Sequence, residues 1–137
     1  MSEQSKESQR RFVEEIQNQG RIDVVDELIA EDMVDHTPFP GLPPNREGAR
    51  MIFEAIRAGF PDHDAEIVHL VAEGNMVATY KTFTGTHEGE FMGIAPTGRK
   101  VTIRVMDFVR YRDGQIVEHW NIVDQAGLLQ QLGAMPA

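Results

Sequence analysis

Cysteine is absent from the 137 residues of this chain. Its absence excludes disulfide bridges, thiol nucleophiles and thiolate metal ligands. Basic residues are scarce too, since 13 lysines and arginines stand against 22 aspartates and glutamates, giving a net charge of −9. An acidic surface without a basic cluster repels a phosphate backbone, so we expect no nucleic-acid partner.

Long apolar runs are missing as well. No segment approaches the roughly 20 apolar residues of a membrane span. The opening residues, MSEQSKESQRR, are polar and lack the apolar stretch of a signal peptide. We therefore expect no membrane partner and a cytoplasmic location. Hydrophobic residues nevertheless make up 41% of the chain, which suits a single domain over residues 1–137 with one core.

Helical periodicity dominates the first sixty residues. Apolar residues at helical spacing predict helices over residues 4–19, 23–30 and 46–60, and a shorter one over residues 125–132. Residues 33–37 are expected to be extended. The four prolines and one glycine of residues 38–45 predict a stiff loop.

Strand-like alternation follows. Residues 65–72 and 76–84 predict one hairpin, and residues 101–124 predict a longer one that turns at residues 112–115. The glycine-rich residues 87–99 are expected to form a loop packed partly on the sheet. Helices followed by strands predict an α+β fold, a cone in which a strongly curved antiparallel sheet of four or more strands wraps around the N-terminal helices. Such a sheet leaves a cavity for a small ligand.

The long hairpin carries polar groups within apolar rows. Because side chains alternate between the faces of a strand, Asp107 shares a face with aliphatic residues of the first strand. On the second strand, His119 and Asn121 share a face with valines. A buried carboxylate, imidazole and amide all need partners. Their presence on neighbouring strands indicates a cavity wall rather than a plain core.

Three motifs resemble a known family: residues 35–38 (DHTP), residues 91–98 (FMGIAPTG), and residues 113–133, which begin DGQIVEHW and end GLLQQLG. They resemble the SnoaL-like polyketide cyclases, or ester cyclases, of the nuclear transport factor 2-like and ketosteroid-isomerase-like superfamily. The resemblance implies the same cone and a homodimer or higher homo-oligomer. It also implies intramolecular aldol condensation of a small, apolar, polyketide-like substrate, without metal or cofactor.

The resemblance also assigns roles to single residues. It places His119 at the family's histidine before the catalytic position and Asn121 at the catalytic aspartate. It places Asp107 at a pocket histidine of the preceding strand and Asp124 at a later aspartate. An amide cannot take up a proton at ordinary pH, so the standard acid/base is missing here. Asp107 offers a carboxylate on the neighbouring strand, and burial is expected to raise its pKa and make it a base near neutrality.

The candidate catalytic residues are therefore Asp107, His119, Asn121 and Asp124. Candidate substrate-binding residues, drawn from the cavity face, the helix end, the loops and the rim, are His36, Phe60, Phe91, Ile103, Val105, Val117 and Val123.

Each polar candidate has a structural alternative. Asp107 could pair with an arginine, Arg104 or Arg110, although alternation puts both on the other face. His119 could be a satisfied core histidine, Asn121 a strand hydrogen-bonding group and His36 a turn residue. Asp124 stands just before a helix, where an aspartate caps the N-terminus. The remaining histidines lack ligand spacing, so no metal site is expected; they are His63, His69 and His87.

Three classes of function stay open. The first is proton-transfer or aldol chemistry on an apolar carbonyl compound. The second is other chemistry on the same fold, such as isomerisation, epoxide hydrolysis or hydroxylation; Asp107, Arg104 and Asp124 do not alternate as an Asp–Arg–Asp epoxide hydrolase site would need. The third is non-catalytic binding of a small molecule, which the amide of Asn121 favours.

The second face of the hairpin predicts how the chain assembles. It carries more apolar surface than a solvated sheet face normally shows, and we expect a homodimer to bury part of it. The residues concerned are Met106, Phe108, Ile116, Trp120 and Ile122.

Overall fold

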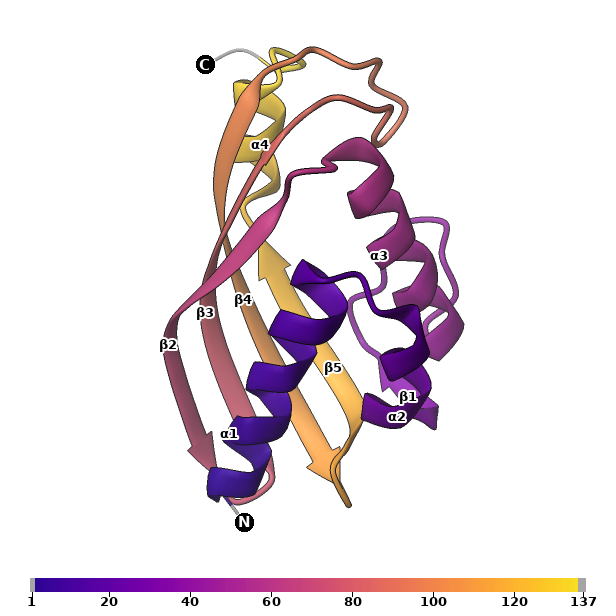
Figure 1. Cartoon of the computed structure of the whole chain (residues 1–137), viewed down its shortest axis with the longest axis vertical. Coiled ribbons are helices and arrows are strands. Elements are labelled where there is room, and N and C mark those ends of the chain that lie inside the picture. The colour runs from indigo at the N-terminus through magenta and orange to yellow at the C-terminus, as the bar shows by residue number, and fades with distance from the viewer. Residues whose placement is uncertain (1, 136–137) are drawn as a thin grey trace.

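The computed structural model describes residues 2–135 (Figure 1). As predicted, helices precede most of the strands along the chain. Helix α1 (Ser2–Arg11) continues into the π-helix η1 (Phe12–Asn18). The other helical segments are η2 (Ile22–Val24), α2 (Val25–Leu28), α3 (Arg46–Gly59) and α4 (Gln125–Gln131). The strands are β1 (Ile29–Asp35), β2 (Asp64–Glu73), β3 (Met76–Thr86), β4 (Lys100–Arg112) and β5 (Gln115–Val123).

The five strands form one curved, unclosed sheet in the order β1-β5-β4-β3-β2. The hairpins β2–β3 and β4–β5 and the pair β3–β4 are antiparallel, whereas β1 runs parallel to β5. The prediction of an antiparallel sheet is thus wrong at this edge. The predicted helix over residues 23–30 is also too long, because the chain is already extended at Ile29. Ile29 and Ala30 are both buried, and a buried apolar pair of this kind fits a short helix and a strand equally well.

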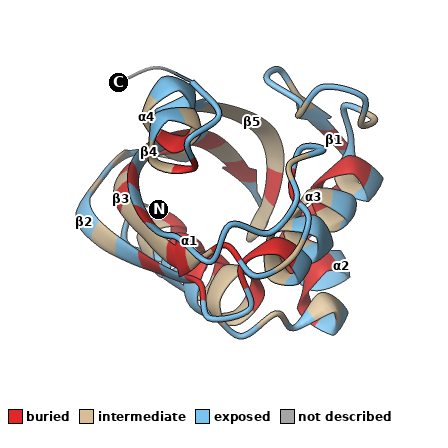
Figure 2. Cartoon of the chain, turned by 90° about the horizontal axis from the view of Figure 1, so that it is seen from above, coloured by how far each residue is buried: buried red, intermediate tan, exposed pale blue. Residues whose placement is uncertain are grey.

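The helices cover the concave face of the sheet. Helix α1 and η1 pack on β2 and β3, α3 packs on β1, and α4 packs on β4. Figure 2 shows the sheet curving around this helical layer. Among residues 2–135, no helix combines the length and the apolar character that crossing a membrane requires.

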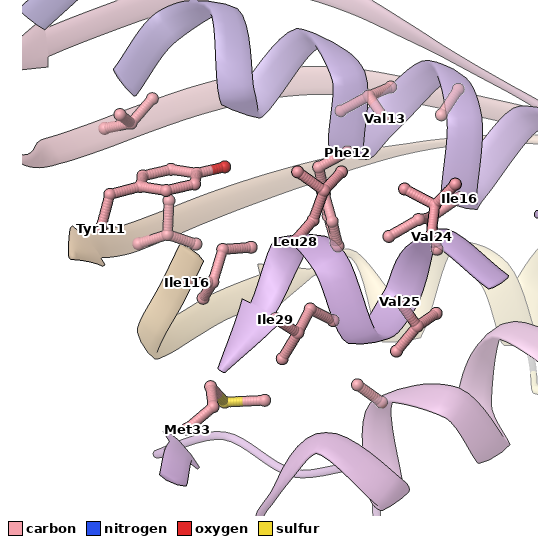
Figure 3. Close-up of a cluster of buried hydrophobic side chains, with 14 residues drawn as sticks. Phe12, Val13, Ile16, Val24, Val25, Leu28, Ile29, Met33, Tyr111 and Ile116 are labelled. Carbon is pink, nitrogen blue, oxygen red and sulfur yellow. The ribbon is translucent and has the colours of Figure 1, made fainter. Parts of the chain in front are cut away.

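The core consists of two clusters of buried apolar side chains. The first joins η1, α2 and β1 to strands β2, β3, β4 and β5, and it includes Phe12, Ile16 and Ile29 (Figure 3). The second joins α4, the 87–99 loop and β4 through residues such as Phe91 and Leu128. Members of both clusters also line a cavity between them.

A bulge changes the alternation at the start of β5. Arg110 pairs with Glu118, but Tyr111 pairs with Ile116, so Val117 is an extra residue on its strand. As a result Ile116 is buried in the core. It does not lie on the outer face as predicted, and Val117 does not take the inward position expected of it. The predicted alternation holds along β4, where Val101, Ile103, Asp107, Val109 and Tyr111 are all buried.

Candidate active site

The cavity has a volume of about 390 Å³ and is lined by the sheet, η1, α3, α4 and the loops after β1 and β3. Its wall is mainly apolar and includes Phe39, Ile52, Phe53, Ile56, Phe60, Phe83, Phe91, Ile103, Val105, Val123 and Leu128. Polar lining residues are fewer and comprise Gln17, Asp35, Thr37, His63, Lys81, Asp107, His119, Asn121 and Gln125. An apolar cavity with a few convergent polar groups is the usual form of a small-molecule site.

Four of the polar residues form a continuous row of alternating charge, Lys81–Asp107–His119–Asp35, which we call the charged row. Nε2 of His119 lies 3.2 Å from Oδ1 of Asp107, and Nδ1 lies 3.1 Å from Oδ1 of Asp35. Nζ of Lys81 contacts Oδ2 of Asp107 and donates to Oε1 of Gln17 at 2.8 Å. The adjacent strands β3, β4, β5 and β1 contribute one residue each, so the row crosses the sheet from strand to strand.

The partners, rather than burial alone, set the charges in the row. Burial would lower the pKa of His119, but the carboxylates of Asp107 and Asp35 raise it to about 9. Burial would likewise raise the pKa of Asp107, yet Lys81 and His119 together bring it well below its ordinary value. His119 is therefore a cation and Asp107 an anion at neutral pH. The prediction that burial raises the pKa of Asp107 is wrong.

The partner of Asp107 also differs from the predicted alternatives. Arg110 bonds to Glu118 at 2.7 Å and Arg104 is exposed, as alternation required. Lys81 takes their place, with its side chain only 4% exposed. The alternation along β3 holds a clue to it, because Lys81 follows the buried positions Val77 and Thr79 on one face.

Asp35 is the second residue of the row that the sequence analysis missed. Its side chain is mostly buried, and burial would raise its pKa, but His119 and Thr37 lower the pKa overall. Its Oδ1 accepts hydrogen bonds from the Thr37 backbone N–H at 3.0 Å and from His119. Asp35 begins the 35–38 motif and faces inward two positions after the buried Met33, so strand alternation in that segment would have found it.

Asn121 lines the cavity beside the row, next to Thr37. The Thr37 hydroxyl accepts from the Asn121 backbone N–H at 2.8 Å and lies 3.1 Å from the Asn121 amide oxygen. The Asn121 amide NH₂ makes no hydrogen bond within residues 2–135. This amide is thus placed to donate to a ligand.

The other predicted residues divide into two groups. Phe60, Phe91, Ile103, Val105 and Val123 line the cavity, whereas His36, Val117 and Asp124 do not.

Each of the three residues outside the lining has a clear environment. His36 stacks on Trp120 with ring centroids 4.5 Å apart and bonds to Glu118. Val117 is the extra residue of the β5 bulge. Oδ1 of Asp124 accepts from the Gly127 backbone N–H at 2.9 Å and caps α4, which is the structural alternative given above.

Metal-binding side chains do not converge in the described part of the chain. No group of three or more histidine, cysteine, aspartate or glutamate residues within residues 2–135 is placed to hold a metal ion.

Sequence comparison assigns most of the chain to one family model. Residues 7–132 match the model of the SnoaL-like polyketide cyclases. A curated relative, the nogalonic acid methyl ester cyclase of Streptomyces nogalater, is 30% identical over 118 residues, which are 85% of this chain and 88% of the relative.

Solved structures share the same architecture. IdmH from Streptomyces antibioticus, a proposed polyketide cyclase, superposes with a TM-score of 0.83 at 39% identity, covering 95% of this chain and 99% of its own. AclR from Streptomyces galilaeus, a proposed hydroxylase, gives a TM-score of 0.88 at 28% identity, covering 100% of this chain and 89% of its own. Proteins of similar fold thus include more than one proposed reaction.

Proposed function

The chain belongs to the SnoaL-like polyketide cyclase family, and on that premise we propose that it closes a ring in a polyketide-like substrate by cofactor-independent intramolecular aldol condensation. The observation that carries this proposal is the imidazolium of His119, held between two carboxylates beside a mainly apolar cavity.

Aldol closure needs the two kinds of group that this site brings together. A base must remove a proton from carbon next to a carbonyl, and positive charge or hydrogen-bond donors must lie where the oxygen becomes negative. The carboxylates of the charged row supply basic oxygens. The cation of His119 and the amide of Asn121 supply the opposing electrostatic stabilisation. The surrounding apolar wall strengthens these interactions by keeping water away.

Asp107 enters this mechanism as an ionised carboxylate. We predicted from the sequence that it is the base, and its charge at neutral pH agrees with that role. Its two oxygens, however, face Lys81 and His119. Asp107 can take a substrate proton only if one of these contacts opens. Its other contribution is electrostatic, because its charge helps to keep His119 protonated.

The size and lining of the cavity favour an apolar substrate of several rings. A volume of about 390 Å³ lies in the range of small-molecule sites. Phenylalanine side chains from the loops, α3 and β3 line it and present flat surfaces to aromatic rings. Since a relative is named for its action on nogalonic acid methyl ester, we propose a polycyclic methyl ester as the first substrate to test.

A second candidate function is non-catalytic binding of the same kind of molecule. Two observations favour it. Asn121 stands where the family resemblance places the catalytic aspartate, and the low pKa of Asp107 makes that carboxylate a weak base.

One experiment separates the two functions. The purified protein is incubated with a panel of polyketide methyl esters while product formation and ligand-induced change in melting temperature are both recorded. Conversion of any member supports the cyclase. A raised melting temperature without conversion supports the binding protein. A panel that produces neither result would contradict the polyketide-like ligand.

A further inference from the structure

The two carboxylates that flank His119 differ in how they meet the cavity. The Asp107 side chain is 3% exposed, whereas the Asp35 side chain is 14% exposed. Asp35 lies at the outer end of the charged row, next to Thr37 and the loop of residues 36–45. A group that exchanges a proton with a substrate must come within hydrogen-bond distance of the reacting carbon. Asp35 is the easier of the two to reach.

The oxygens of the two carboxylates are also engaged differently. Both Asp107 oxygens are in contact with cations, Oδ1 with His119 and Oδ2 with Lys81. On Asp35, the contacts with His119 and Thr37 all converge on Oδ1. Oδ2 of Asp35 accepts no hydrogen bond from any described residue between 2 and 135. Oδ2 of Asp35 is therefore available to a ligand, while Oδ1 is held by its hydrogen bonds to His119 and Thr37.

We infer that Asp35 is the catalytic acid/base that exchanges a proton with the substrate, and that Lys81 and Asp107 are positioning residues that hold His119 as a cation beside it. This inference rests on the proposed cyclase function and names the residue that reaches the substrate. It changes the role of Asp107 from base to fixed counter-charge.

The proton balance of the reaction closes within this arrangement. Oδ2 of Asp35 bonds to a proton on carbon next to a carbonyl, and the electron pair of the broken C–H bond becomes an enolate. The enolate carbon attacks a second carbonyl carbon of the same molecule and forms the new C–C bond. The resulting alkoxide takes the proton back from Asp35. His119 keeps both of its protons throughout, and no oxidant, reductant or co-reactant enters.

Lys81 makes the arrangement stable without taking part in that exchange. A lone Asp107 carboxylate in a buried position would be costly. Lys81, itself held by Gln17 from η1, neutralises it from the side opposite His119. Tyr111 lies on the same strand face and donates to Gln9 at 2.6 Å, so it adds no charge to the row. The row as a whole carries two positive and two negative charges.

Chemical rescue tests the assignment. Asp35→Ala removes the carboxylate and leaves space for a small acid at an accessible position. We expect turnover of the converted methyl ester to fall roughly 10²–10⁴-fold and to recover in proportion to added formate or acetate. Asp107→Ala should lose activity without recovery, because that position is buried. Asp32→Ala, an exposed carboxylate on the same strand that pairs with Arg112, is the matched control and should keep wild-type turnover.

The outcomes separate the inference from the proposed function. If wild-type protein converts no substrate, both are overturned. If the wild type is active and Asp35→Ala is equally active, or if Asp107→Ala is the variant that formate rescues, the inference alone is wrong. Asp35→Asn covers the case in which the alanine variant does not fold. It is nearly isosteric, and it should show the same loss without rescue; full activity of this variant would overturn the assignment.

Discussion

At the scale of single residues, the site illustrates how neighbours outweigh burial. Asp107 is buried, and burial alone predicts a raised pKa and a carboxylate poised as a base. Lys81 and His119 reverse that direction. Asp107, His119 and Asn121 could be predicted to face inward because the alternation of side chains along a strand follows directly from the order of residues in the sequence. Alternation along β3 indicates that Lys81 is buried, but its contact with Asp107 depends on how β3 and β4 align, which no local pattern specifies.

His119 should make folding stability depend on pH above neutrality. Its pKa is raised from 6.5 to about 9 in the folded protein. Protonated His119 therefore contributes fully to the free energy of unfolding below about pH 6.5, and this contribution is lost as the pH rises through about 9. At about 1.4 kcal/mol for each tenfold change in proton affinity, the loss is up to about 3 kcal/mol. Urea unfolding at a series of pH values measures it.

The matched variant for this prediction is His119→Gln. Glutamine keeps a polar side chain in the row but does not titrate, so its free energy of unfolding should be nearly flat between about pH 6.5 and pH 9. Equal slopes for the wild type and the variant would show that His119 is not the cation described here.

The two carboxylates make stability depend on pH in acid. The pKa values of Asp35 and Asp107 are lowered in the folded protein, so their ionised forms stabilise the fold above about pH 4, and this contribution is lost as the pH falls.

At the scale of elements, the hairpins and most helices could be predicted because their signals are local. Helical periodicity and the Asp113-Gly114 turn, whose two residues both have positive φ, each act within a few residues. The errors at this scale have a non-local origin. Residues 29–35 form the strand β1 because they pair with β5, which lies more than eighty residues further along the chain. The bulge at Val117 follows from the pairing of β4 with β5.

Asp124 provides a test at the start of α4. Because its side chain accepts from the Gly127 backbone N–H, Asp124→Ala should lower the free energy of unfolding by about 1 kcal/mol. Turnover per folded molecule should stay at the wild-type value. Asp124→Asn should retain both, since asparagine caps as well as aspartate. Loss of turnover in Asp124→Asn with unchanged stability would instead identify Asp124 as a catalyst, the role that the family resemblance gave it.

At the scale of the whole molecule, the outer face of the sheet is the main apolar surface left uncovered. Met106, Phe108 and Ile122 are 49%, 45% and 78% exposed. Met106 pairs directly with Ile122, and Phe108 pairs with Trp120, so these side chains form one patch across β4 and β5. Ile116, which the sequence analysis placed here, is buried instead. A contiguous apolar patch of this kind marks an interaction surface.

We predict that a second copy of the chain covers this patch. Light scattering at micromolar concentration should give the mass of a dimer, and Ile122→Asp should shift it toward the monomer, because a carboxylate at the centre of the patch would be buried without a partner. Glu31→Lys, at an exposed position on β1, changes charge elsewhere and should leave the dimer intact. A monomer mass for the wild-type chain would contradict the prediction.

We propose that the cationic His119, set between two carboxylates, makes this cavity a ring-closing active site. The most direct test of this proposal is the turnover of a polycyclic polyketide methyl ester by the wild type and by His119→Gln, with ligand affinity measured in parallel. We predict conversion by the wild type and a loss of roughly 10²–10³-fold in the variant, the usual cost of removing one donor that stabilises a developing oxyanion, while the dissociation constant of the ester stays within a few-fold. Conversion by His119→Gln at the wild-type rate would contradict the account.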